Sequence, residues 1–401
     1  MNAPMNFEIV ETEIDGAVIK VVGVGGAGGN AVNHMVNSGV QGVEFITVNT
    51  DKQALARSRA QNTIQLGEGL GAGANAAAGR AAAEAARGEL KAALAGANMV
   101  FITAGMGKGT GTGASPILAE VAKELGALTV GVVTKPFGFE GAKKMRIAEE
   151  GIEALAAHVD SLIVVLNEKL FEVMDDDASL DDAFHKADDV LHNAVAGIAE
   201  IINVPGLVNV DFADVRTIMG EQGKAMMGIG EAAGIDRARL AAEQAVASPL
   251  LEGVDLQGAR GVIVNITASR SLKLRETNEV LNTIKQFCAE DATIIHGTVF
   301  EEELGDRLRV TVVATGIGRK QGRVHLVPQS APMQRTGTYD ASPLNSARNP
   351  QGFSGGRGYD SLDTPTVWRD PRADAAARVQ ALEEKGVERF DIPAFLRRQA
   401  D

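Results

Sequence analysis

Short aliphatic runs alternate with helical patterns along the first half of the chain, and this alternation restricts the fold more than any other feature. Five runs are rich in Val and Ile and show no polar alternation, which is typical of strands buried on both faces of a parallel sheet. They cover residues 17–22, 43–48, 99–104, 128–134 and 161–166. The pattern therefore predicts an α/β protein with a Rossmann-like parallel sheet.

Glycine-rich or polar segments follow each of these predicted strands. They are 23–29, 49–51, 105–113, 135–137 and Asn167. In open α/β sheets, ligands bind outside the carboxyl ends of the strands. We therefore expect these five segments to meet at one ligand-binding crevice.

A long helix and a second set of strands follow. Residues 179–203 carry an unusually broad apolar face, which indicates a helix buried between two bodies. Ser179 and Asp182 resemble a capping box at its start. Further strands are predicted at 261–269, 292–300 and 307–316, with a helix at 276–287. These elements predict a second α/β domain.

Composition excludes several classes of protein. The 401 residues suffice for two domains with apolar cores. A single thiol, Cys288, excludes a disulfide framework and a thiolate metal cluster, and it favours a reducing compartment such as the cytoplasm. Residues 1–16 show no secretory signal pattern, and no apolar stretch reaches bilayer-spanning length. The net charge of −13 argues against a nucleic-acid partner.

The composition changes sharply after Gly318. Residues 319–385 are rich in Gln, Ser, Pro, Gly and Arg, so we expect a disordered linker. Residues 386–401 regain apolar side chains, including Ile392 and Phe395, which is typical of a peptide that docks on a partner protein. This terminal segment lacks a lipidation Cys and amphipathic length, so we expect no direct membrane insertion.

The first glycine loop alone leaves several functions open. Gly23-x-Gly25-x-x-Gly28 fits the dinucleotide fingerprint, and Asp51 lies near the spacing of a ribose-binding acid. An NAD-dependent enzyme or a chance glycine-rich turn would both satisfy this pattern. However, neither a His nor a Cys lies at the matching strand ends to serve hydride transfer.

The second glycine loop narrows the choice to a nucleoside triphosphate. Residues 105–113 lie between a predicted strand and a helix expected to begin near Pro116. Successive glycines let backbone N–H groups approach phosphate oxygens, and a helix N-terminus adds its dipole. Two facing phosphate cradles suit a triphosphate. Lys108 is followed by Gly109 and position 102 is Ile, so the loop is not a Walker A sequence.

Segment 107–113, with the sequence Gly-Lys-Gly-Thr-Gly-Thr-Gly, resembles the signature of the tubulin/FtsZ family. Segments 23–30, 49–51, 71–75, 134–137, 139–141 and 209–214 support the resemblance, and 391–396 is similar to the family's C-terminal peptide. Nearly the whole chain resembles the FtsZ branch, the bacterial cell-division homologues of tubulin.

The resemblance implies a self-assembling cytoskeletal GTPase. The expected parts are an N-terminal extension (1–16), a GTP-binding domain (17–178), a connecting helix (179–203), a C-terminal activation domain (204–318), the linker (319–385) and the docking peptide (386–401). Head-to-tail filaments would form the division ring (Z ring) at mid-cell in the cytoplasm. Membrane tethers and regulators of the division machinery would bind residues 386–401.

The resemblance also assigns site residues. Asn209, Asp211 and Asp214 would act on the GTP of a neighbouring subunit, although spacing alone would make the two carboxylates the polar start of a helix. GTP or GDP, with Mg²⁺, would be bound by Gly25, Gly26, Ala27, Gly28, Asn30, Asn49, Asp51, Gly71, Ala72, Gly73, Gly105, Met106, Gly107, Lys108, Gly109, Thr110, Gly111, Thr112, Gly113, Pro136, Glu140, Lys144, Asn167, Phe184 and Asp188. The six histidines lack metal-ligand spacing, so no metal held by protein ligands alone is expected.

Three positions depart from the family pattern. Lys108 stands where Gly is usual, Lys144 where Arg is common, and Ala76-Ala77 where a Pro-acid pair is usual. Lys108 would either contact phosphate or crowd a tight backbone. We expect the Lys108 side chain to crowd the loop. A GTP-binding filament protein with impaired hydrolysis is therefore an alternative to an active GTPase.

Overall fold

The computed structural model describes residues 16–174, 177–204, 208–220, 223–251, 259–289 and 292–317. The predicted linker (319–385), the docking peptide (386–401) and all of the N-terminal extension except Gly16 lie outside the described residues.

One ten-stranded sheet runs through the described part of the chain, in the order β3-β2-β1-β4-β5-β6-β7-β10-β8-β9. The first six strands pair in parallel. They are β1 (Ile19–Val24), β2 (Glu44–Asn49), β3 (Asn62–Gln65), β4 (Met99–Gly105), β5 (Leu128–Lys135) and β6 (Ser161–Leu166). The order 3-2-1-4-5-6 is that of doubly wound sheets, so the predicted fold class is confirmed. Only β3, a short polar edge strand, escaped prediction.

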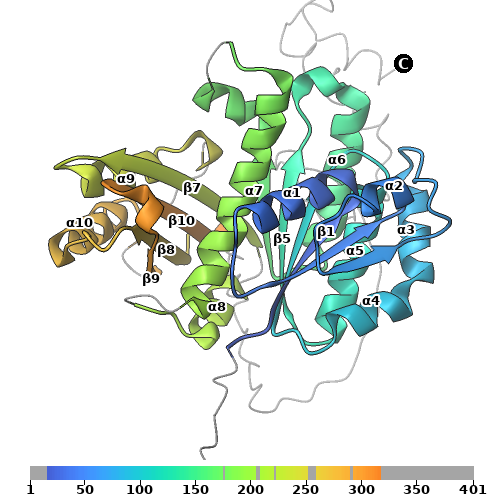
Figure 1. Cartoon of the computed structure of the whole chain (residues 1–401), viewed down its shortest axis with the longest axis horizontal. Coiled ribbons are helices and arrows are strands. Elements are labelled where there is room, and N and C mark those ends of the chain that lie inside the picture. Colours follow the sequence, from blue (N-terminus) through green and yellow to red (C-terminus); the bar gives the residue numbers. More distant parts are fainter. Residues whose placement is uncertain are drawn as a thin grey trace, which may run out of the picture. The chain divides into compact units, whose positions relative to one another are not determined.

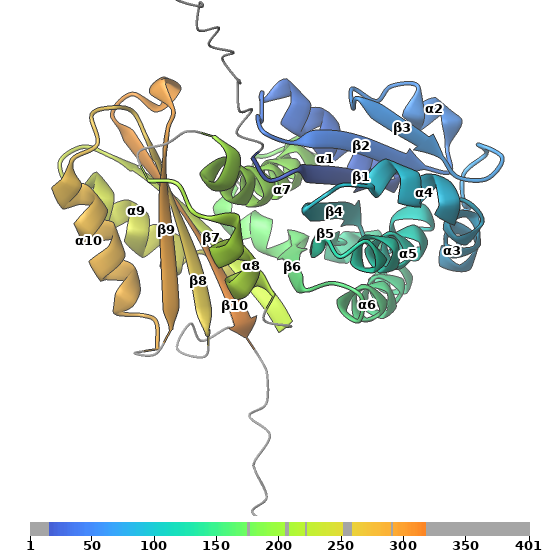
Figure 2. The ribbon, with the colours of Figure 1, turned by 90° about the horizontal axis from the view of Figure 1, so that it is seen from below.

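Helices cover both faces of these six strands (Figures 1 and 2). Helix α1 packs on β1, β2 and β4 beside α7, and α5 and α6 pack on strands β4 to β6. Bounds are α1 (Gly25–Asn37), α2 (Lys52–Leu55), α3 (Ala76–Ala85), α4 (Arg87–Leu94), η1 (Gly138–Glu140), α6 (Ala142–Ala156) and η2 (Asn167–Val173). Two separate apolar clusters fill the two faces.

Helix α5 (Thr110–Glu124) begins earlier than predicted. The expected start near Pro116 is wrong, because the helix begins at Thr110 and Pro116 lies inside it. Proline suits the first turn, which made it a misleading start signal. The correction places the N–H groups of Thr110 and Gly111 in the first turn, where they have no intrahelical acceptor.

Helix α7 (Leu180–Asn203) lies between the β1–β6 part of the sheet and the β7–β10 part (Figure 1). Its predicted capping box is present, because Ser179 Oγ accepts from Asp182 N at 3.2 Å and Asp182 Oδ2 accepts from Ser179 N at 2.9 Å. Its apolar face joins one cluster that contains Ile163 of β6 as well as Ile263 and Val313 from the far strands. The helix is therefore fixed from both sides.

The second half carries the remaining four strands. Its elements are α8 (Phe212–Met219), β7 (Gly223–Ala233), α9 (Arg237–Val246), η3 (Pro249–Leu251), β8 (Gly261–Ala268), α10 (Leu274–Lys285), β9 (Thr293–Phe300), η5 (Glu302–Leu304) and β10 (Arg307–Ile317). Strand β10 is antiparallel to β7 and β8, and β9 is parallel to β8. The three predicted strands are confirmed, and α8 begins where the spacing of Asp211 and Asp214 indicated the start of a helix, whereas β7 and α9 were not predicted. A short parallel pairing at the start of β6 continues the sheet into β7.

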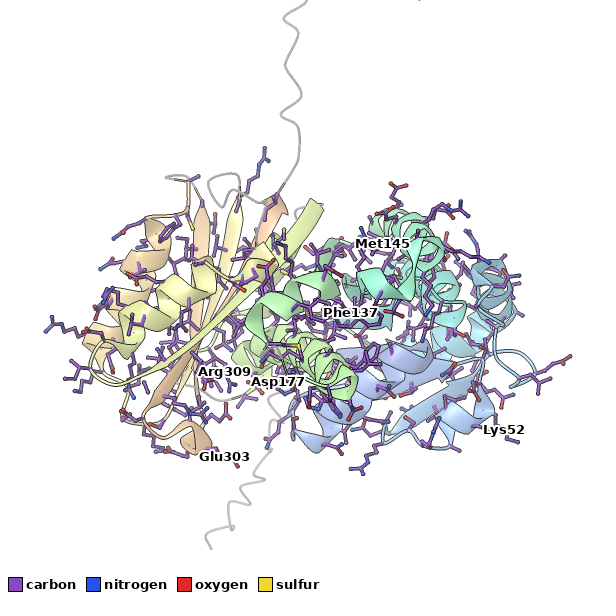
Figure 3. All side chains as sticks on the ribbon, turned by 90° about the horizontal axis from the view of Figure 1, so that it is seen from above. Lys52, Phe137, Met145, Asp177, Glu303 and Arg309 are labelled. Carbon is purple, nitrogen blue, oxygen red and sulfur yellow. The ribbon has the colours of Figure 1, made fainter. Side chains whose placement is uncertain are left out.

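Glu200 of α7 is a half-buried residue whose carboxyl interacts with Glu301 and with Arg309 of β10. Burial and the charge of Glu301 raise the pKa of Glu200 to about 7, although the positive charge of Arg309 (labelled in Figure 3) acts in the opposite direction. The folded state thus holds a proton that the unfolded chain releases near its ordinary pKa. Stability must then fall as pH rises from 5 to 8.

We predict that Glu200→Gln removes this penalty. The variant should raise the unfolding temperature at pH 8, by an amount equivalent to at most about 3 kcal/mol, and should change it little at pH 5. Thermal unfolding from pH 5 to 8 measures this, with the exposed Glu303→Gln as the matched control. An unfolding temperature that follows the unsubstituted protein at every pH would contradict the prediction.

Candidate nucleotide-binding site

A cleft of about 470 Å³ opens at the carboxyl ends of β1, β2, β4, β5 and β6. It lies at the point where the strand order reverses between β1 and β4, as expected for ligands of doubly wound sheets. All five segments predicted to converge contribute residues to its wall.

Most of the predicted nucleotide-binding residues line this cleft. They are Gly25, Gly26, Ala27, Asn30, Asn49, Asp51, Gly71, Ala72, Gly105, Met106, Lys108, Gly109, Thr110, Gly111, Pro136, Glu140, Asn167, Phe184 and Asp188. The remaining ones, Gly28, Gly73, Gly107, Thr112, Gly113 and Lys144, are not part of the wall. Of these, Gly107 and Thr112 determine the conformation of the loop after β4 without lining the cleft.

The loop after β4 and the start of α5 form a preorganised anion cradle. Gly107 has a φ of 98°, a conformation that side chains disfavour, and it turns the chain toward α5. Thr112 Oγ1 accepts from Gly107 N at 2.9 Å and holds this turn. The Thr110 hydroxyl lies 2.6 Å from that of Thr50. Thr110 and Gly111, whose N–H groups have no intrahelical acceptor, line the cleft beside Gly109.

The first glycine loop meets the second one. Gly25, with a φ of 74°, starts α1 directly after β1. A Cβ at this position would lie 2.9 Å from Gly111 N, so a side chain would collide with the opposite cradle. The two glycine loops therefore lie against one another in the same part of the cleft wall.

Two hydrogen-bond acceptors lie unsatisfied at the opposite end of the cleft. Asn167 is 5% exposed, and its Oδ1 has no hydrogen-bond partner. No hydrogen bond or ion pair among the described residues engages the carboxylate of Asp188, which also lines the cleft. Burial raises the pKa of Asp188 to about 6. A buried acceptor without a partner, as at Asn167, is costly, and the half-buried Asp188 carboxylate adds a further acceptor, so this end fits a ligand with N–H donors.

A phenylalanine cluster borders this acceptor end. The buried ring of Phe137 (labelled in Figure 3) lies 5.1 Å from the ring of Phe139, 5.2 Å from Phe171 and 5.5 Å from Phe184, measured between centroids. Phe184 is 42% exposed and contributes to the cleft wall, so its ring is accessible to a planar ligand. Phe139 and Phe171 are also exposed.

Three charged residues of the prediction are engaged within the protein. Asp51 Oδ1 caps α2 by accepting from Gln53 N at 2.8 Å and Ala54 N at 3.4 Å. Glu140 accepts from Phe137 N and from Lys144 Nζ, at 3.1 and 3.0 Å. The Lys144 side chain is thereby directed to Glu140 instead of to the cleft.

The wall also contains residues that were not assigned individually. Val24, Gly29, Thr50, Ala74 and Thr134 lie within loop segments named in the sequence analysis, whereas Asn33, Thr47, Ala54, Arg57, Ser58, Ala187 and Leu191 were missed. Asn33 follows Asn30 by three residues on α1, a spacing that places both on one helix face and could have revealed it. Arg57 lies in the segment after α2, which contains no recognisable motif.

Lys108 lies exposed on the cleft wall and belongs to no ion pair among the described residues. Its backbone has no positive φ, since Ala74 alone shows one among the described non-glycine residues. A tight contact occurs at the next position instead, where a Cβ on Gly109 would lie 2.7 Å from Ala72 Cβ. The expectation that Lys108 crowds the loop is therefore wrong, and its cation is available to an anionic ligand.

Asn209, Asp211 and Asp214 lie away from this cleft. Asp211 and Asp214 are exposed at the start of α8, and Val210 N donates to Ile201 O at 3.1 Å, which ties the segment to the far end of α7. The part of α7 between Asp188 and Asn203 rises roughly 22 Å. The carboxylates of one chain therefore cannot serve the cleft of the same chain.

The described residues contain no group of three or more His, Cys, Asp or Glu side chains placed to hold a metal ion. Among the same residues, no helix is both long and apolar enough to cross a membrane.

Comparison with known proteins identifies the family to which the chain belongs. Residues 18–175 match the model of the tubulin/FtsZ family GTPase domain, and residues 223–318 match that of the FtsZ family C-terminal domain. The cell division protein FtsZ of Pseudomonas aeruginosa is 54% identical over 401 residues, covering 98% of this chain and 100% of that protein. The FtsZ of Pseudomonas putida is 53% identical over 400 residues, with the same coverage.

Solved structures with a similar fold agree with the family comparison. An FtsZ dimer of M. jannaschii matches with a TM-score of 0.73 and 46% identity, over 75% of this chain and 88% of that one. CetZ2 of Haloferax volcanii, at 21% identity and a TM-score of 0.63, shares the fold over 76% of this chain and 94% of its own.

Fold and cleft together define a nucleotide-binding α/β protein with two adjacent glycine-rich loops at the carboxyl ends of the strands. The chain belongs to the tubulin/FtsZ family and, within it, to the FtsZ family.

We predict that Lys108→Gln weakens GTP binding about three- to tenfold at low salt, because an exposed cation contributes modestly to phosphate binding and is screened by salt. The loss should shrink as ionic strength rises. Titration with a fluorescent guanine nucleotide at several salt concentrations measures this, with Lys91→Gln on α4 as the control. Affinity that matches the control at every salt concentration would show that the side chain points only to solvent.

Proposed function

We propose that the protein is a GTPase that assembles head to tail into filaments and builds the bacterial division ring at mid-cell. The observation that carries the proposal is the separation of the cleft from the carboxylates of α8 by the length of α7. Membership of the family, whose model for residues 18–175 is a GTPase domain, supports the activity.

Guanine is the base that fits the acceptor end. The Asp188 carboxylate would accept from the N1–H and the 2-amino group, while Asn167 would serve the remaining edge of the base. Adenine lacks both of those donors, so it would leave the buried acceptors unpaired. Phe184 would stack on the base, as its accessible ring at the same end allows.

The two glycine loops would hold the phosphates. The first turn of α5, with Gly109, Thr110 and Gly111, would present N–H groups to the terminal phosphates, and Gly25 and Gly26 would face them from α1. Since no cluster of protein ligands for a metal occurs among the described residues, Mg²⁺ would be held mainly by phosphate oxygens and water. The ion would neutralise phosphate charge.

Hydrolysis would use two chains. Asp211 and Asp214 of one subunit would approach the γ-phosphate bound by the next and orient a water molecule for attack on phosphorus. The bond between the γ-phosphorus and the β–γ bridging oxygen would break, GDP would leave with that oxygen, and the carboxylates would assist removal of the water proton. Asn209 would position this loop.

Exposed apolar residues near the cleft would form one side of the head-to-tail contact. Phe139 and Phe171 pack around Phe137, which contacts Phe184 of the cleft wall, and they are 59% and 47% exposed. Leu180, one turn before Phe184 on α7, is 58% exposed. Apolar groups gathered beside a ligand site favour coverage by another protein surface. Such a contact joins two different faces of the subunit, does not close on itself and therefore generates a filament.

Light scattering with GTP, GDP and ATP in parallel, together with phosphate release, tests the proposed function. GTP alone should support both assembly and turnover. Assembly with ATP at the same rate, or phosphate release at a concentration that shows no assembly, would contradict it.

We predict that Asp214→Asn leaves GTP affinity within about twofold and lowers turnover by two or more orders of magnitude, because the carboxylate acts on a neighbour's nucleotide. Asp211→Asn should behave alike. Nucleotide titration and phosphate release on the same preparations give both numbers, with the exposed Asp236→Asn as control. A large loss of GTP affinity would place these residues in the cleft of their own chain and refute the assignment.

Membrane tethers and regulators of the division machinery are the proposed partners of residues 386–401. We predict that deletion of these residues leaves GTP-driven assembly of the purified protein unchanged and abolishes its recruitment to the division site in cells. Sedimentation and fluorescence microscopy measure the two outcomes. A truncated protein that fails to polymerise, or that still reaches the division site without full-length protein, would contradict this role.

A further inference from the structure

Thr50 joins three segments of the cleft wall through its own hydrogen bonds. It directly follows β2, lines the cleft and is only 4% exposed. Its hydroxyl lies 2.6 Å from that of Thr110, which is also buried and belongs to the first turn of α5. Its carbonyl accepts from Gly71 N at 2.8 Å, in the glycine-rich loop after β3. Thr50 therefore connects the end of β2 both to that loop and to the start of α5.

The two buried hydroxyls hold one hydrogen more than they use between them. A threonine hydroxyl carries a single hydrogen, so only one of the two hydrogens can lie between Thr50 and Thr110. Among the described residues, neither hydroxyl has a second hydrogen-bond partner. A buried O–H donor without an acceptor is unfavourable. The pair is therefore suited to a ligand that brings an acceptor oxygen into the cleft.

Thr110 is the member of the pair that lies in the anion cradle. It belongs to the first turn of α5, where backbone N–H groups lack intrahelical acceptors, and it lines the cleft. The next hydroxyl along the helix, that of Thr112, does not line the cleft and accepts from Gly107 N at 2.9 Å. When Thr50 donates to Thr110, the hydroxyl hydrogen of Thr110 is left for a phosphate oxygen.

The strand order places this pair at the end of the cleft away from the base-binding residues. Asn167 follows β6 and Thr50 follows β2, with β5, β4 and β1 between them. Four strand spacings of about 4.8 Å separate β6 from β2 by roughly 19 Å. In the proposed function the base binds at Asn167. A triphosphate chain that extends along the strand ends would then bring its terminal phosphate closest to Thr50 and Thr110.

We propose that Thr50 is a positioning residue for the terminal phosphate of GTP: its hydroxyl donates to Thr110 Oγ1 and thereby directs the Thr110 hydroxyl to that phosphate. The inference rests on the proposed function, because it concerns the nucleotide of the same cleft. Two O–H donors in series that end on an anion polarise one another, which strengthens both hydrogen bonds. GDP has no phosphate at this end, so Thr50 contributes to the binding of GTP and not of GDP.

The test compares the affinities of the full-length protein and its Thr50→Val variant for GTP and for GDP. Fluorescent analogues of both nucleotides are titrated at protein concentrations below those that give light scattering by assembly. Loss of one hydrogen bond should lower the affinity for GTP about three- to tenfold, and the affinity for GDP should change by less than about twofold. The matched control is Thr129→Val, which removes a buried hydroxyl at the amino end of β5 and should alter neither affinity.

Further variants separate positioning from packing. Thr50→Ser keeps the hydroxyl and should restore the affinity for GTP, whereas Thr50→Ala, which leaves room beside Thr110, should lose it as Thr50→Val does. In the Thr110→Val background, Thr50→Val should lower the affinity for GTP no further. A ratio of GTP to GDP affinity that Thr50→Val leaves unchanged, whether both affinities fall or neither does, overturns the inference and leaves the proposed function standing. Failure of the unsubstituted protein to prefer GTP over ATP would instead refute the proposed function.

Discussion

Packing of α7 against both parts of the sheet is the constraint on which the remaining structure depends. Its apolar residues share one cluster with β6 and with the far strands, and each fully buried Leu, Val or Ile side chain contributes roughly 1.5–3 kcal/mol. A helix fixed on both sides cannot change its length or tilt easily. It therefore holds the base-binding end of the cleft and the carboxylates of α8 at a set separation.

In the proposed function, that separation leaves each chain with two half-sites that cannot combine with each other. The cleft, between α1 and α5, would bind the phosphates through backbone N–H groups, whereas Asp211 and Asp214 are presented to solvent at the start of α8. Neither half-site would then suffice for hydrolysis. Turnover would be coupled to assembly through the geometry of a single subunit.

The strand pattern and glycine loops predicted much of the fold and the cleft because buried parallel strands are continuous apolar runs and tight phosphate loops require glycine. Strands β3 and β7 escaped because their sequences are polar or glycine-rich. Prediction also failed where function depends on side-chain partners. The pairing of His34 with Asp189 joins helices distant in the sequence, and the exposure of Lys108 depends on how its loop packs, so spacing alone cannot reveal either. The engagement of Lys144 by Glu140 is an i,i+4 pair, which the spacing of the two residues could have revealed.

The central claim is that two chains complete one hydrolytic site, and mixing two defective chains tests it most directly. Asp214→Asn keeps an intact cleft, whereas Gly109→Val blocks the cleft, because a side chain there meets Ala72, and keeps the carboxylates. Phosphate release from the mixture, with co-sedimentation showing that both chains associate, is the measurement. The account predicts turnover well above the sum of the two separate preparations, and turnover equal to that sum would contradict it.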